Sequence, residues 1–188
     1  MSGSAAGGAV WIQSAGALVL LAVAVHCAAR LVQAGRAAAR PDVTDGADVL
    51  MALGLAAMLS PLGDPIPPTA GVVVFGLVAA WSLVGAVGAG EPGRRVAWVW
   101  HAVGGAAMVL MFAMPVGAAW TVLTWTLAAG FALFAAWSAL AAARGVVAVT
   151  TSARTVPAMV LAPPVTSLCH AVMAAGMIFL LLATASGG

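Results

Sequence analysis

Six apolar stretches limit what this 188-residue chain can fold into. About 20 apolar residues in an α-helix cross the hydrocarbon core of a bilayer. The stretches cover residues 10–32, 47–62, 70–89, 96–114, 118–143 and 166–184. The second is the shortest, and is also compatible with a half-span or a re-entrant segment. The pattern predicts an all-α transmembrane fold, a six-helix bundle forming a single integral membrane domain over residues 1–188.

Charged residues are too scarce for a surface that faces water. They make up 6% of the chain, whereas hydrophobic residues make up 64%, and soluble domains carry about 25% charged residues. The net charge of +2 excludes a nucleic-acid-binding protein, which needs a clustered basic face. We therefore expect the lipid bilayer as the main partner and no nucleic acid. No nucleotide or hydrolase motif is present, so the sequence does not predict an enzyme.

The seven arginines all fall at alternate junctions of the apolar stretches. They are Arg30, Arg36 and Arg40 at the first junction, Arg94 and Arg95 at the third, and Arg144 and Arg154 at the fifth. Cytoplasmic loops of membrane proteins carry an excess of positive residues. The segregation predicts a multi-pass protein of the bacterial cytoplasmic membrane with these loops inside and both termini outside.

The chain repeats itself three times. In the even-numbered stretches, residues at offsets 0, +3, +7 and +10 form one stripe on a helix. The stripes start at Asp48, His101 and His170 and continue with methionine, leucine or glycine. The odd-numbered stretches align at His26-Cys27, Trp81-Ser82 and Trp137-Ser138. The repeat predicts three tandem helical hairpins, in which the indole N–H groups of the two tryptophans bond neighbouring helices. The small-residue runs 85–88 and 104–105 favour close helix contact.

The three histidines and Asp48 are expected at one depth on the cytoplasmic side. His26 precedes Arg30 by one turn, and His101 follows Arg95 by six residues, which is about 9 Å along a helix. His170 follows a proline pair by a similar distance, and Asp48 begins its stretch on the same side. Cys27 and Cys169 each adjoin one of the histidines. Ionisable residues inside spans are costly and usually functional.

The methionines add soft ligands to this layer. After Met1, seven of the eight lie in the even-numbered stretches. Thioether, thiolate and imidazole together are ligands of Cu(I), so the sequence predicts a membrane metal-binding protein that acts as a Cu(I) carrier, chaperone or sensor. The predicted ligands are His26, Cys27, Asp48, Met51, His101, Met108, Met111, Cys169, His170, Met173 and Met177.

Two other hypotheses remain open. Methionine is an ordinary filler of apolar cores, and histidines in spans often bond neighbouring helices. The chain is then a non-catalytic accessory or structural subunit of a larger membrane complex, such as a respiratory complex, or a homo-oligomer. Alternatively, two of the three histidines ligate a haem. Metal analysis and a visible-light spectrum separate these hypotheses.

Several short stretches resemble one known family. They are His-Ala-Val-Met-Ala-Ala-Gly-Met at 170–177, the stretch from Met51 to Met58-Leu-Ser-Pro61, and the arginine-rich first loop. They are similar to an uncharacterised family of small actinobacterial membrane proteins, catalogued as a domain of unknown function. The resemblance covers most of the chain. It implies an actinobacterial origin and no established activity, and Asp48 takes the polar place that starts the second helix in that family.

Overall fold

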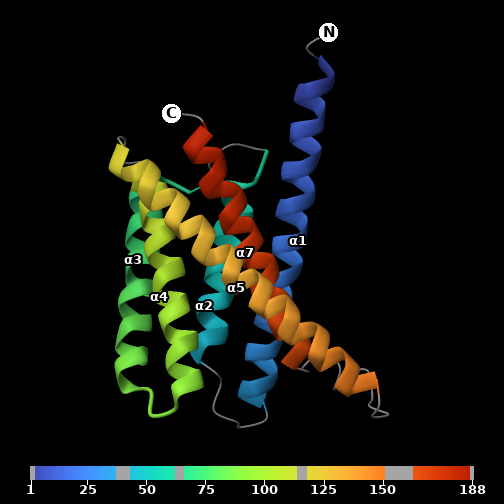
Figure 1. The fold of residues 1–188 in the computed structure, drawn as a ribbon, viewed down its shortest axis with the longest axis vertical. Helices are drawn as coiled ribbons and strands as arrows, with labels where there is room; N and C mark the ends of the chain where they lie inside the picture. Colours follow the sequence, from blue (N-terminus) through green and yellow to red (C-terminus); the bar gives the residue numbers. More distant parts are fainter. Residues whose placement is uncertain (1–2, 37–42, 62–65, 114–117, 151–162, 187–188) are drawn as a thin grey trace. The chain divides into compact units, whose positions relative to one another are not determined.

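The computed structural model describes residues 3–36, 43–61, 66–113, 118–150 and 163–186. This part of the chain contains six helices and no strand, which confirms the all-α prediction (Figure 1). The helices are α1 (Gly3–Arg36), α2 (Val43–Met58), α3 (Pro68–Gly88), α4 (Pro92–Ala113), α5 (Ala118–Thr150) and α7 (Pro163–Ser186). All of them except α2 are long and apolar enough to cross a membrane. The chain is therefore a membrane protein.

The helices pack as hairpins of sequence neighbours. The main contacts join α1 to α2, α3 to α4, and α5 to α7, as the three-hairpin prediction requires. The chain divides into two units, Met1–Val116 and Gly117–Gly188. Within the first unit, α2 also contacts α4 and α3. These contacts join the first two hairpins, and the third hairpin forms the second unit by itself.

Helix α2 differs from the span expected over residues 47–62. It begins at Val43 and ends at Met58, so its 16 residues extend for about 24 Å, less than the roughly 30 Å core of a bilayer. Its first turns carry Asp45 and Asp48, both of which are buried. The helix is thus short and partly polar, and it lies among other helices of the first unit.

Two contacts fix how α1 and α2 lie against each other. Arg30 pairs with Asp45, and Gly16 lies against the Leu59 side chain just beyond the end of α2. The two helices are therefore antiparallel, and equal lengths of chain separate the two contacts on α1 and on the α2 side.

Helices α3 and α4 approach closely at glycines. A Cβ atom built at Gly105 would lie 3.0 Å from the backbone nitrogen of Ala79, and one at Gly85 would lie 2.6 Å from the Trp98 ring. Both positions belong to the small-residue runs, so the prediction of close contact is confirmed at these two glycines. At Gly88, in contrast, a Cβ would meet nothing within 4 Å.

The described arginines of the first unit lie toward one end. The C-terminal end of α1, the N-terminal end of α2 and the α3–α4 turn lie together there, at the lower side of Figure 1. Arg30 lies near that end of α1, and Arg94 and Arg95 lie in the first turn of α4. We call this the arginine end. Within this unit, the arrangement agrees with the segregation of arginines in the sequence.

Candidate metal centre

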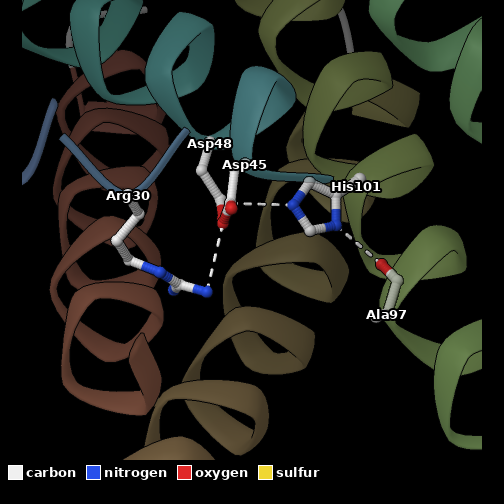
Figure 2. A network of polar contacts seen from close by, with 5 residues as sticks. All are labelled: Arg30, Asp45, Asp48, Ala97 and His101. Carbon is white, nitrogen blue, oxygen red and sulfur yellow. Dashed lines mark hydrogen bonds and ion pairs between the residues drawn. The ribbon is translucent and has the colours of Figure 1, made fainter. Parts of the chain in front are cut away.

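Helix α2 presents two buried carboxylates to two different helices. Asp45 and Asp48 are 4% and 2% exposed. They lie three residues apart, and hence near each other on the helix surface. Oδ1 of Asp45 lies 3.3 Å from Nη2 of Arg30 on α1, and Oδ1 of Asp48 lies 2.8 Å from Nε2 of His101 on α4 (Figure 2). An unpaired buried carboxylate is strongly destabilising, so the two pairs hold α2 between α1 and α4.

The hydrogen bonds of His101 define its tautomer. Nδ1 lies 2.7 Å from the carbonyl oxygen of Ala97, and Nε2 faces Asp48. A carbonyl oxygen only accepts, so Nδ1 must carry a hydrogen and donate it. One further proton then lies between Nε2 and the carboxylate. With either partner holding it, the Asp48–His101 pair has no net charge, which suits an apolar surrounding.

The arrangement of His101 and Asp48 resembles that of protein ligands in a metal site. Histidines that bind metals usually donate the second ring N–H to a carbonyl or carboxylate, which fixes the tautomer and the ring orientation. The Nδ1–H bond of His101 to Ala97 has this form. Nε2 and Oδ1 face each other across 2.8 Å, and both are ligand atoms for transition metals. A cation that takes the place of the shared proton, with a small separation of the two side chains, would have both as ligands.

The other predicted ligands of α1 remain outside this contact. Cys27 is buried, whereas His26 is partly exposed, although its Nε2 atom is buried and has no hydrogen-bond partner in the described part of the chain. Among the described residues of the first unit, no three histidine, cysteine, aspartate or glutamate side chains gather closely enough to hold a metal. The structure thus brings together Asp48 and His101 in this unit, but not His26 or Cys27 with them.

His170 and Cys169 lie on α7 in the second unit. Cys169 is buried, and His170 is partly exposed beside Phe134 of α5, with 6.1 Å between the ring centroids. Because the two units are described separately, the expected meeting of the three histidines stays a prediction.

The methionine stripe faces inward. The five predicted methionine ligands are all buried: Met51, Met108, Met111, Met173 and Met177. A Cβ at Gly54 of α2 would lie 2.8 Å from the Met108 methyl carbon, so this thioether fills the contact between α2 and α4. The stripe is buried, and the geometry fits ordinary packing as well as metal passage. Met114 and Met159 lie outside the described residues.

The prediction for the two repeat-related tryptophans is wrong. Trp81 and Trp137 are 59% and 63% exposed, so their indoles point away from the packed helices. In each of the three aligned pairs, the second residue is the buried one: Cys27, Ser82 and Ser138 are each about 2% exposed or less. The alignment contained this signal, because only a small side chain fits where helices approach as closely as α3 and α4 do.

Comparisons with curated proteins and with solved structures find no match to this chain. A family model does match, and its description is "Domain of unknown function (DUF5134)". The match covers residues 39–184, from the junction before α2 almost to the end of α7. It includes every predicted ligand except His26 and Cys27. The chain belongs to this family of unknown function, DUF5134.

Proposed function

We propose that this protein binds a copper ion within the membrane at Asp48 and His101, and that it acts as a copper carrier, chaperone or sensor. The observation that carries the proposal is the buried contact of 2.8 Å between the imidazole and the carboxylate. Ionisable side chains in spans are rare, and they commonly line ion pathways. The proposal includes no catalytic step.

Copper is the metal that the surrounding side chains favour. Among divalent first-row metals, Cu²⁺ binds nitrogen and oxygen ligands most tightly, and thioethers favour Cu(I). Met51 follows Asp48 by one turn of α2, and Met108 follows His101 by two turns of α4. Buried sulfur thus continues from the pair along both helices. We propose that this sulfur gives the ion a path through the apolar part of the helices.

His170 and Cys169 are proposed as further ligands on the strength of the sequence alone. His170 starts the same stripe in the third hairpin that Asp48 and His101 start in the first two, and Cys169 adjoins His170. Transition-metal sites usually have more than two protein ligands, so a contribution from α7 would raise the affinity. Replacing His170 by alanine in otherwise wild-type protein tests this contribution separately.

The test is the amount of copper bound by purified protein, under reducing and under oxidising conditions. Wild-type protein should hold roughly one ion per chain, as expected for one set of ligands. The double variant Asp48→Asn/His101→Gln should hold none. The matched control is Arg30→Gln/Asp45→Asn, which also removes a polar pair between α2 and a neighbour, and it should still bind copper.

Two outcomes would contradict the proposal. If the Asp48/His101 variant binds as much copper as the control, the metal lies elsewhere. If wild-type protein takes up no copper, the accessory-subunit hypothesis is preferred, with methionine as core filler. A visible haem spectrum of the purified protein would favour the bis-histidine hypothesis instead.

We also propose that the arginine end faces the cytoplasm of a bacterium and that both termini face outward. The support is the excess of positive residues in cytoplasmic loops together with the arginines of three junctions. A reporter that is active only in the cytoplasm should be inactive when fused to the C-terminus and active when inserted after Gly90 in the α3–α4 turn. The reverse pattern would overturn the orientation.

A further inference from the structure

Ser82 of α3 is a buried hydroxyl that packing alone does not explain. The residue is 0% exposed, and its Oγ atom has no hydrogen-bond partner within the described residues. Most buried side-chain polar atoms are hydrogen-bonded, and an exception calls for a cause such as an ion or a water. A buried hydroxyl without a partner costs free energy that alanine at the same place would avoid.

The register of α3 and α4 puts Ser82 at the level of His101. Ala79 lies against Gly105, and Gly85 lies against Trp98. Ser82 is halfway between the two contact residues of α3. His101 is close to halfway between the two contact residues of α4, so Ser82 and His101 lie at nearly the same height along the antiparallel helices.

Ser82 also lies on the face of α3 that contacts α4 and α2. It follows Gly71, Phe75 and Val78 on one buried stripe of α3. Cβ atoms built at Gly71 and at Gly54 would meet the rings of Phe112 on α4 and of Phe75 on α3, respectively. The stripe thus contacts both α4 and α2, the helices that carry His101 and Asp48.

A relay in which His101 activates the Ser82 hydroxyl does not fit the bonds observed. A histidine that acts as base for a serine needs one ring nitrogen directed at the hydroxyl. Nδ1 of His101 donates to Ala97, and Nε2 faces Asp48. Both nitrogens are engaged, so the hydroxyl is better explained by a ligand that occupies the same layer.

We propose that Ser82 faces the copper ion held by Asp48 and His101 and supplies a neutral oxygen, directly or through a bound water, to its surroundings. This inference rests on the proposed function, and it adds α3 to the helices that form the site. The repeat agrees with it, because Cys27 holds the aligned position in the first hairpin. A thiol is therefore a natural substitute at residue 82.

Two substitutions at this position should change the copper affinity in opposite directions. Ser82→Ala should lower it about tenfold, the lower end of the usual loss when a supporting group of a metal site is removed. Ser82→Cys should raise the Cu(I) affinity roughly tenfold or more, because thiolate is a soft ligand. A purely structural role would give a loss, or no change, in both variants.

The measurement is competition with a coloured Cu(I) chelator under reducing conditions. All proteins carry Cys27→Ser, so that the introduced thiol is the only one in the first unit, and Cys169 is kept because it is a proposed ligand. The matched controls are Thr124→Ala and Thr124→Cys on α5, because Thr124 is also 0% exposed and its hydroxyl also lacks a partner in the described chain. These controls should bind copper like their parent.

The outcomes separate this inference from the proposed function. If the parent binds copper and both Ser82 variants behave like the Thr124 controls, or both lose affinity, the role of Ser82 is overturned while copper binding stands. If wild-type protein binds no copper, the proposed function fails, and the role of Ser82 fails with it. A loss with alanine and a gain with cysteine would support the inference.

Discussion

The two ends of α2 are held against their neighbours by different kinds of contact. At the arginine end, α2 is joined to its neighbours by Arg30–Asp45 and Asp48–His101. Farther along α2, Gly54 lies against the side chains of Phe75 and Met108, and the Phe75 ring stacks on another phenylalanine with 5.8 Å between centroids. Charge pairs hold the first turns of α2, and the fit of large side chains against glycine holds its second half.

The difference indicates which part of α2 is better suited to bind a ligand. Apolar contacts between helices are close-packed, so an added group there destabilises the fold. A buried polar pair is weak evidence for stability, because desolvation offsets much of the attraction between its members. Such a pair is easier to explain by function. The contrast therefore favours the arginine end as the site of chemistry and assigns the far end to the scaffold.

The largest effect is expected from removing one member of the buried pair. His101→Leu leaves the Asp48 carboxylate buried without its partner, and this should cost about 3–5 kcal/mol of unfolding free energy. Asp48→Asn/His101→Gln removes the charge and should cost clearly less. Unfolding in mixed micelles, without copper, gives both values. If the single variant is as stable as the double variant, the pair does not carry a buried charge.

The next largest effect should come from the glycine contact at the far end. Gly54→Ala places a methyl group against the Phe75 ring and the Met108 methyl group, which should cost about 1–3 kcal/mol. The control is Gly76→Ala on α3, where the nearest side-chain atom would lie 3.9 Å away, so stability should hardly change. Equal losses at the two glycines would show that the contact with Phe75 and Met108 is not responsible, because helix propensity by itself favours alanine at both positions.

A smaller effect is expected for the other polar pair. The Arg30 side chain is 18% exposed, which weakens the ion pair, and glutamine can still donate a hydrogen bond to the buried Asp45 carboxylate, so Arg30→Gln should cost about 1–2 kcal/mol. Arg30→Lys should recover part of this loss, because lysine keeps the charge but not the planar fork. A loss as large as that of His101→Leu would remove the distinction between the two pairs of α2.

The smallest change in stability is expected at a methionine. Met108→Leu keeps the volume and removes the sulfur, and such exchanges usually cost less than about 1.5 kcal/mol. Copper loading should nevertheless become slower, since a thioether on the proposed path is lost. Stopped-flow mixing with Cu(I) measures the loading rate. An unchanged rate would assign Met108 to packing alone.

The sequence predicted the features that depend on periodicity. Hairpins of consecutive helices follow from apolar stretches joined by short connections, and the buried stripes follow from the 3.6-residue repeat. Asp48 and His101 were both chosen because charged groups in spans are rare. Their direct bond joins two hairpins, and periodicity within one helix does not show which helices of different hairpins meet.

The misses have equally physical causes. The expected second stretch, residues 47–62, left out Asp45, because hydropathy alone cannot distinguish an exposed carboxylate from one that is paired with Arg30. Trp81 is larger and more distinctive than Ser82, so the repeat directed attention to the exposed residue of the two. Steric room between helices, set by Gly85 and Gly105, decides which of them is buried. The bounds of α2 were missed because its polar first turns hide the start of the helix.

The most direct test of the account is the stabilisation that copper gives to wild-type protein. Copper at about 100 times its dissociation constant should add about 2.7 kcal/mol to the unfolding free energy of a protein with one site. Asp48→Asn/His101→Gln should gain nothing, and Arg30→Gln/Asp45→Asn should gain as much as wild type. Equal stabilisation of wild type and the Asp48/His101 variant would contradict the account, as would no stabilisation of wild type at all.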